Sequence, residues 1–236
     1  MSEWKKPERI VGVMALAIAL LAIILPAVMP APSLRLRGGP LVHLPFNIGG
    51  SEEGRLLYSE KFTGVDRIAL QAANSLVKIE RSEGASEVAV SIYGKGGGHY
   101  NVDKRSGILV VNASNVLVKI ELPGSKPIPL TARVENGMLK AEGVILDTIV
   151  LENGMGAVEA RVVKSGRIIA SNSFAKFALS GKGGIKLEAH SLNGAVSVTG
   201  DYEYTLTSGE AEIGKGPNTV YVEAKNTYLS IRVRGQ

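Results

Sequence analysis

The sequence predicts an all-β domain, and within that class it favours a β-solenoid over a β-sandwich. Short runs between Leu130 and Val233 alternate apolar and polar residues, which is the period-two pattern of half-buried strands. Turn dipeptides such as Asn136-Gly137 and Asn153-Gly154 separate these runs. The chain also repeats itself, because Glu-Asn-Gly-Met occurs at 135–138 and again at 152–155. Such self-similarity is typical of stacked repeat architectures.

A second repeat and the composition bear on the same choice. The pentapeptide Leu-Val-Lys-Ile-Glu begins at Leu76 and again at Leu117, which fits either two similar hairpins or whole multiples of one solenoid turn. Aromatic residues make up only 5% of the chain, so the core has to be built from Val, Ile, Leu and Ala, as suits a narrow coil. The irregular spacing of the turn signals keeps the β-sandwich as the alternative.

An apolar segment near the N-terminus predicts a membrane anchor. The stretch Ile10–Val28 carries no charge and is long enough, as a helix, to cross a hydrocarbon core of about 30 Å. Lys5, Lys6 and Arg9 precede it, and this bias places the N-terminus in the cytoplasm. We therefore expect a cytoplasmic N-terminus at 1–9 and an uncleaved transmembrane signal anchor at 10–29. The competing interpretation is a signal peptide that is removed after export.

The remainder divides into a tether and the β-domain. Residues 30–54 are rich in Pro and Gly and predict a semi-extended spacer on the outer side of the membrane. Residues 55–236 form the expected extracytoplasmic β-solenoid domain. Its predicted strands include 55–62, 67–70, 75–80, 88–92, 100–103, 108–111, 116–121, 158–162, 185–189, 220–224 and 229–234.

Composition and spacing argue against several classes of function. The formal charge of +5 is small and scattered, so we expect no nucleic-acid partner. The absence of cysteine excludes disulfides, thiolate catalysis and cysteine-zinc sites. His43, His99 and His190 are too far apart for the usual zinc spacings. The sequence gives no catalytic, cofactor-binding or metal-ligating residue, and we expect a protein that is not an enzyme and uses no cofactor.

Two kinds of residue remain as candidate surface sites. Exposed tyrosines stack on sugars or on partner proteins, although tyrosine is also an ordinary strand residue. The candidate contact residues are Tyr93, Tyr100, Tyr202, Tyr204, Tyr221 and Tyr228. Asn112-Ala-Ser114 is a glycosylation sequon, which makes Asn112 a candidate glycosylation site in an exported chain.

One stretch of the sequence resembles a known family. A strand ends in Leu-Pro at Val118–Pro123, the next ends in Asn-Gly at Pro129–Gly137, and strand-turn units follow to the C-terminus. This pattern resembles the putative-adhesin domains of bacteria and archaea from about Val65 to Val233. Those domains usually have Asp after the Ser/Asn-Gly pair, whereas Met138 stands here. The resemblance implies an adhesin-like β-solenoid at the cell surface, often tethered to a membrane, and it brings no ligand or catalytic residue.

The expected function is that of a single-pass membrane-anchored surface protein. Its rigid β-domain acts as an adhesin-like or envelope structural module and meets cell-surface glycans, envelope proteins or copies of itself. The first alternative is a polymerising scaffold similar to the bactofilins, which would require a cytoplasmic β-domain. The second alternative is a carbohydrate-active enzyme, with acids from distant turns brought together on one face.

Overall fold

The computed structural model describes residues 33–34, 42–43, 54–124 and 126–235. The anchor predicted at 10–29 and most of the predicted tether lie outside these residues. Within them, β1 (Ser33–Leu34) pairs antiparallel with β2 (Val42–His43). None of the described residues lies in a helix with the length and hydrophobicity that crossing a membrane requires.

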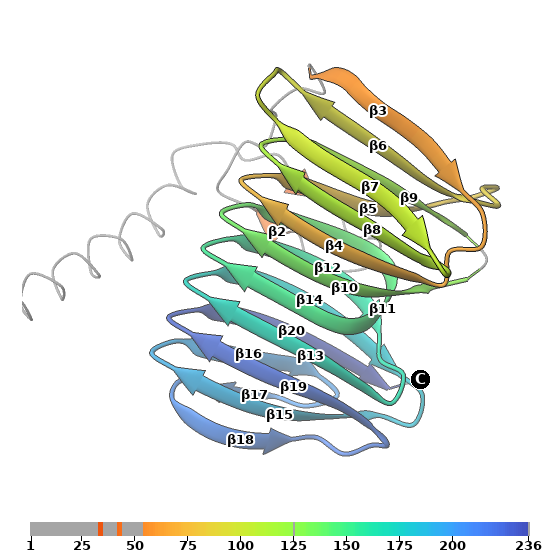
Figure 1. The fold of residues 1–236 in the computed structure, drawn as a ribbon. Coiled ribbons are helices and arrows are strands. Elements are labelled where there is room, and N and C mark those ends of the chain that lie inside the picture. The colour runs from red at the N-terminus through yellow and green to blue at the C-terminus, as the bar shows by residue number, and fades with distance from the viewer. Residues whose placement is uncertain (1–32, 35–41, 44–53, 125, 236) are drawn as a thin grey trace, which may run out of the picture. The chain divides into compact units, whose positions relative to one another are not determined.

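The domain that begins at Gly54 is all-β in its described part, which confirms the all-β class of the prediction (Figure 1). Its eighteen strands form one hydrogen-bonded sheet. The first half of the chain supplies β3 (Arg55–Phe62), β4 (Arg67–Ala73), β5 (Leu76–Ser82), β6 (Val88–Gly94), β7 (His99–Arg105), β8 (Ile108–Ser114), β9 (Leu117–Pro123), β10 (Ile128–Glu135) and β11 (Met138–Glu152). The second half supplies β12 (Met155–Arg161), β13 (Ser165–Ser171), β14 (Phe174–Gly181), β15 (Ile185–Leu192), β16 (Ala195–Gly200), β17 (Tyr204–Leu206), β18 (Gly209–Ile213), β19 (Asn218–Lys225) and β20 (Tyr228–Gly235).

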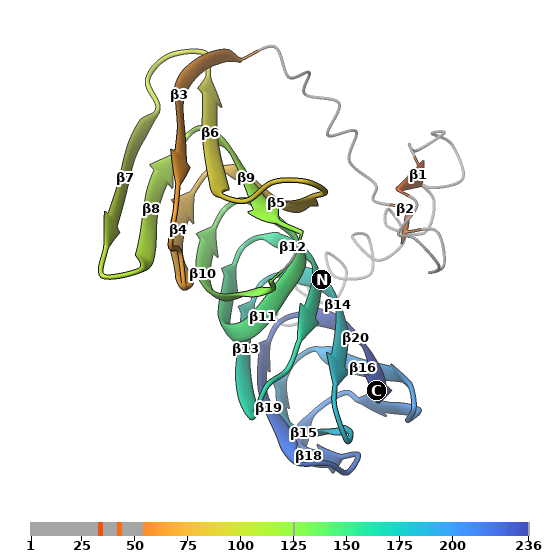
Figure 2. The same ribbon diagram turned by 90° about the vertical axis from the view of Figure 1, so that its right-hand side faces the viewer.

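The strands are arranged in two stacks, whose outer surfaces we call face A and face B (Figures 1 and 2). Face A follows the order β7, β8, β4, β10, the second half of β11, β13, β19, β15 and β18. Face B follows the order β3, β6, β9, β5, the first half of β11, β12, β14, β20, β16 and β17. Pairing is parallel along the interior of both stacks and antiparallel only where β3, β6, β7, β17 and β18 close the ends.

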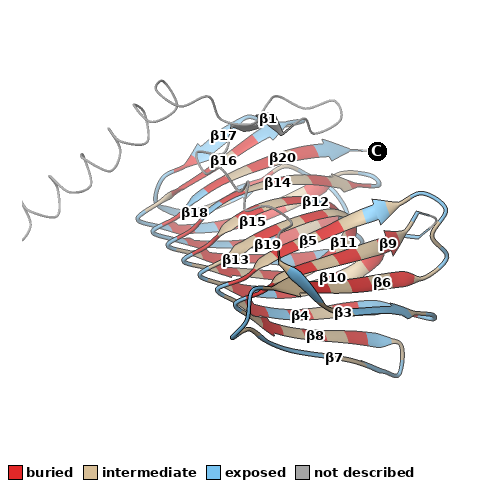
Figure 3. Cartoon of the chain, turned by 90° about the horizontal axis from the view of Figure 1, so that it is seen from above, coloured by how far each residue is buried: buried red, intermediate tan, exposed pale blue. Residues whose placement is uncertain are grey.

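The core lies between the two stacks and follows the alternation seen in the sequence (Figure 3). In β5, Val77 and Ile79 are buried, whereas Lys78 between them points outward. Small and medium aliphatic side chains fill the space, and Phe177 is the only buried aromatic among the described residues. The expectation of a core built from Val, Ile, Leu and Ala is therefore correct, and the period-two pattern is what fixes which side of each strand faces inward.

Both sequence repeats lie next to their own copies. The segment beginning at Leu76 pairs in parallel with the one beginning at Leu117, so that Lys78 lies beside Lys119 and the other identical residues likewise align. In the second repeat, Met138 lies beside Met155. Identical side chains of neighbouring strands therefore stack on one another along each face.

Seven asparagines form the tight corners at which the chain passes from face A to face B, along the left edge of Figure 1. Each has a φ between 47° and 57°, a left-handed conformation that asparagine tolerates better than most residues. In stack order they are Asn115, Asn74, Asn136, Asn153, Asn172, Asn226 and Asn193. The backbone N–H of each of the first six donates to the carbonyl that precedes the next corner, for example Asn172 to Lys225 at 2.9 Å.

Glycine follows three of these asparagines because of close backbone packing, and not because of the positive φ that the sequence indicates. An Asn-Gly pair predicts positive φ at both residues, but Gly137, Gly154 and Gly194 do not have it. A Cβ on Gly137 would lie 2.3 Å from the Ser75 carbonyl oxygen, and one on Gly194 would lie 2.3 Å from the Thr227 carbonyl oxygen. Glycine is needed here because the neighbouring turn of backbone approaches so closely.

Stack order differs from chain order at the C-terminus. The final pair of strands does not lie at the end of the stacks: β19 lies between β13 and β15, and β20 lies between β14 and β16. The end is closed instead by β17 and β18. Both edges of the last strand are therefore hydrogen-bonded within the chain.

Candidate functional site

A shallow hollow on face A is the candidate site. It has a volume of about 180 Å³ and is lined by Arg167, Glu188, His190, Tyr221, Val222 and Glu223. The three strands that carry these residues, β13, β19 and β15, are parallel neighbours. Their register creates two outward rows, with Arg167, Tyr221 and Glu188 in one and Glu223 and His190 in the next.

Tyr221 is the central residue of this hollow. Its side chain is on the outer side of β19, and the residue is 49% exposed. Arg167 on one side of it forms an ion pair with Glu223, with 3.6 Å between the guanidinium and carboxylate. The exposed ring face offers an apolar platform, and the groups around it both donate and accept hydrogen bonds.

A lysine holds the acidic side of the hollow. Lys186 Nζ lies 3.0 Å from the Glu188 carboxylate and 2.9 Å from that of Glu212 on β18. Hydrogen bonds to Glu212 and Glu188 raise the pKa of Lys186, with a smaller contribution from their charges. The hollow thus carries both signs of charge, which suits an uncharged, hydroxyl-bearing ligand better than a strongly ionic one.

The predicted tyrosines do not form one row. Tyr221 lies in the hollow on face A, whereas Tyr93 and Tyr228 lie in a single outward row of face B. Tyr202 is packed against the core, and its hydroxyl bonds to the backbone of Lys215 at 3.0 and 3.2 Å. Tyr204 is in the short closing strand β17.

Tyr100 belongs to a tyrosine pair that links the two stacks at the end nearest β3. Its ring centroid is 5.7 Å from that of Tyr58, and its hydroxyl donates to the Leu57 carbonyl at 3.0 Å. Burial raises the pKa of Tyr58 to about 12, and a hydrogen bond to Glu60 and the charge of that carboxylate act in the same direction. These contacts close the end of the domain, with Tyr58 packed against the core and Tyr100 still 39% exposed.

Asn112 lies on face A in the middle of β8. It is half-buried and stands beside Asn101 of β7 and Gln71 of β4 in an outward row of amide side chains. The glycosylation of Asn112 remains a prediction.

Face B carries rows of paired charges. Lys119 contacts Glu121 at 2.8 Å, and Lys78 contacts Glu80 at 3.0 Å on the neighbouring strand. Lys140 bridges Glu80 and a further glutamate, Glu142. Burial alone would raise the pKa of Glu80, but hydrogen bonds from Lys78 and Lys140 outweigh it, and the pKa is lowered.

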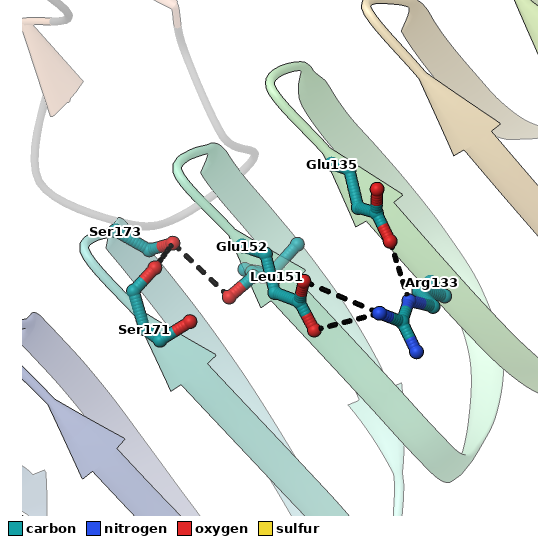
Figure 4. A network of polar contacts seen from close by, with 6 residues as sticks. All are labelled: Arg133, Glu135, Leu151, Glu152, Ser171 and Ser173. Carbon is teal, nitrogen blue, oxygen red and sulfur yellow. Dashed lines mark hydrogen bonds and ion pairs between the residues drawn. The ribbon is translucent and has the colours of Figure 1, made fainter.

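A similar network crosses face A near the asparagine corners (Figure 4). Arg133 contacts Glu135 on its own strand at 2.8 Å and Glu152 on the next strand at 3.1 Å. These two glutamates begin the two copies of Glu-Asn-Gly-Met, so the repeat places two acids within reach of one guanidinium. The network is exposed and well satisfied, which is typical of a structural surface feature.

The described part of the chain holds no group of three or more His, Asp or Glu side chains arranged to bind a metal ion. His190 lies in the hollow and His99 begins β7, while His43 lies in β2. The three histidines therefore come from separate elements, as their sequence spacing indicates.

The sequence did not predict Arg167, Glu188 or Glu223 as site residues. It also did not predict that His190 lies next to them. Their only local signal is that each occupies an outward position of an alternating strand. Their proximity depends on the insertion of β19 between β13 and β15, which no local pattern encodes.

Comparison with known proteins gave structural neighbours only. No family model matches the chain, and no curated protein matches it. It is similar to the crystal structure of a putative cell adhesion protein from Clostridium sporogenes, with 13% identity, a TM-score of 0.48, and coverage of 75% of this chain and 98% of that one. It is also similar to a putative adhesin from Bacteroides fragilis, with 10% identity, a TM-score of 0.36, and coverage of 75% and 96%.

Proposed function

We propose that residues 54–236 form a β-solenoid that acts as a non-catalytic, adhesin-like binding module on the cell surface. The parallel pairing of the interior strands supports the solenoid, because the hairpins of a β-sandwich pair antiparallel. The uncharged stretch Ile10–Val28 and the cations before it support a single membrane anchor with the β-domain outside.

The observation that carries the binding role is the exposed Tyr221 within its polar hollow. An aromatic ring that is 49% exposed, with hydrogen-bonding groups on both sides, is the arrangement that recognises the apolar face and the hydroxyl rim of a sugar. The two acids of the hollow support a non-catalytic role, since Glu188 is held by Lys186 and Glu223 by Arg167 rather than by one another. A neutral glycan is the proposed ligand.

Location is tested by treating intact cells with protease and probing β20 with an antibody. We expect the β-domain to be degraded while a cytoplasmic protein survives. Survival on intact cells, with cleavage only after lysis, would reject the surface location and favour the cytoplasmic scaffold.

Binding is tested on an array of neutral glycans with cells that carry the full chain. The matched variants are Tyr221→Ala, which removes the ring, and Tyr221→Phe, which keeps it. We expect Tyr221→Ala to lose most of the bound signal and Tyr221→Phe to keep most of it. No signal from the unaltered chain, or equal signals from all three, would reject the hollow as a glycan site.

A further inference from the structure

Face B carries a continuous stripe of outward apolar side chains. Eight successive strands contribute one each, at positions that lie directly beside one another in the sheet. In stack order the stripe consists of Leu56, Tyr93, Leu117, Leu76, Met138, Met155, Phe174 and Tyr228. The alternation in each strand places these residues on the side away from the core.

The stripe is long and open. Eight strands at a spacing of about 4.8 Å span about 34 Å. Leu56 is 50% exposed, Phe174 41% and Tyr228 63%, while the residues between them are half-buried, each lying between neighbours of the same stripe. A contiguous apolar patch of this size on a soluble surface marks an interaction site.

The row beside the stripe is mostly polar, and part of its charge is neutralised within the chain. In this row Lys119, Lys78 and Lys140 each contact a glutamate of the same chain. The row also contains Ser91, Ala157, Lys176 and Ser230. Apolar centre and paired polar rim are the anatomy of a protein–protein interface. Because Lys119, Lys78 and Lys140 are already paired with glutamates, a second copy of face B meets little electrostatic repulsion when it approaches the first.

The spacing of the stripe identifies its partner. A surface that packs against it along its whole length has to repeat its apolar groups every ~4.8 Å. An α-helix repeats every 5.4 Å and drifts out of step within about 34 Å, and one face of an extended peptide repeats every ~6.8 Å. A second stack of parallel strands has the matching period, and two such rows interdigitate as in a steric zipper.

We propose that two copies of this chain associate stripe to stripe through face B, around a two-fold axis. The stripe with the lysine row and the glutamate row on one side of it measures about 34 by about 20 Å, which gives roughly 700 Å² per copy and approaches the ~800 Å² per partner of a standard interface. A two-fold axis closes the pair, so association stops at the dimer. The proposal goes beyond the proposed function, because it concerns association between copies of the chain on face B and not the ligand of the hollow on face A.

The test uses the full chain in its native membrane and exploits the absence of cysteine. Single cysteines are introduced at Leu76, Met138 or Met155, in the middle of the stripe, and the cells are treated with a mild oxidant. The matched control is Ile169→Cys, which is also half-buried and outward but lies on face A. We expect a disulfide-linked dimer in at least one stripe variant at about tenfold the level of the control, because a bound pair raises the local thiol concentration to about millimolar.

A second experiment disrupts the stripe-to-stripe contact and keeps the introduced cysteine. Phe174→Glu and Tyr228→Glu change exposed side chains, so the fold is expected to survive, as resistance to limited proteolysis will verify. Introduced together with Met155→Cys, they should return the dimer yield to that of Ile169→Cys. Equal yields from stripe and control variants, or an unchanged dimer yield after Phe174→Glu and Tyr228→Glu, would overturn the proposal. Protease shaving reports location alone, so the two proposals fail independently.

Discussion

The side-chain amide of Asn172 donates a hydrogen bond of 3.1 Å to the side-chain oxygen of Asn153, its neighbour along the corner. Asn226 in turn donates to Asn172 at 3.2 Å. All three residues have a φ between 47° and 49°. At these three corners one residue type thus meets two requirements, a left-handed backbone and a side chain that bonds to a neighbouring corner.

Replacing Asn172 tests both requirements. Asn172→Ala removes two side-chain hydrogen bonds and leaves an unfavourable left-handed residue, so the free energy of unfolding should fall by about 2–4 kcal/mol. Asn172→Gly removes only the hydrogen bonds and should cost about 1–2 kcal/mol. Urea denaturation measures both. The control is Asn101→Ala in the exposed strand β7, which should stay within about 0.5 kcal/mol of the unaltered chain. Equal losses for Ala and Gly would show that backbone conformation is unimportant here.

Two buried serines should respond in opposite directions to the same substitution. The Ser173 hydroxyl shares its one hydrogen between the carbonyls of Ser171 and Leu151, at 2.7 and 3.1 Å (Figure 4). It also accepts a hydrogen bond from the Gly154 N–H at 3.2 Å. Ser173→Ala should therefore lower the free energy of unfolding by about 1–3 kcal/mol.

Ser191 is the matched case, because its buried hydroxyl has no hydrogen-bond partner among the described residues. Ser191→Ala removes an unsatisfied polar group and should raise the free energy of unfolding by about 1 kcal/mol. Urea denaturation of the two variants side by side checks the sign. A loss of stability in Ser191→Ala would mean that the hydroxyl has a partner, such as an ordered water molecule.

Alkaline pH should destabilise the domain through Tyr58. Its pKa is raised to about 12 in the fold, so the folded state keeps the phenol protonated where the unfolded chain has lost its proton. The resulting stabilisation is fully present below about pH 10 and disappears as the pH rises through about 12. Phenolate absorbance is measured against pH for the unaltered chain and for Tyr58→Phe. Subtracting the second titration curve from the first leaves the titration of Tyr58. A midpoint near pH 10 in that difference curve would contradict the burial and the Glu60 contact.

Removing the last two strands should disrupt the middle of the stacks. Deletion of residues 217–236 removes β19 and β20 and takes a parallel partner from each of β13, β14, β15 and β16. We expect loss of cooperative thermal unfolding and rapid proteolysis of the segment from β15 to β18. The comparison is a chain in which residues 204–213 are replaced by a Gly-Ser linker, which removes only the closing strands and should remain protease-resistant. Similar resistance in both chains would argue against the inserted position of β20.

Much of the strand structure was predictable, because burial on one side dictates a period of two. Val220, Val222 and Ala224 alternate in the sequence and are all buried. The corners at Asn74, Asn115, Asn172 and Asn226 were not predicted, since Ser, Val or Thr follows them instead of Gly. Only the register of the stack shows that these four positions are equivalent to the Asn-Gly corners.

Neither the candidate hollow nor the apolar stripe could be read from local patterns. Tyr221 and Arg167 lie 54 residues apart and become neighbours only through β19. In the stripe, Leu76 and Met138 each begin an ordinary strand, and an isolated outward Leu or Met has no special meaning. The stripe exists because outward residues of eight strands share one register, which depends on long-range pairing.

The insertion of β20 between β14 and β16 also sets the timing of folding. When the chain is synthesised or exported from its N-terminus, all the other strands of the sheet appear before β20, which completes the middle of face B. The space between β14 and β16 has to remain accessible until the eight residues of β20 enter it. The two stacks are therefore completed by closing a gap between β14 and β16 rather than by adding turns at a growing end.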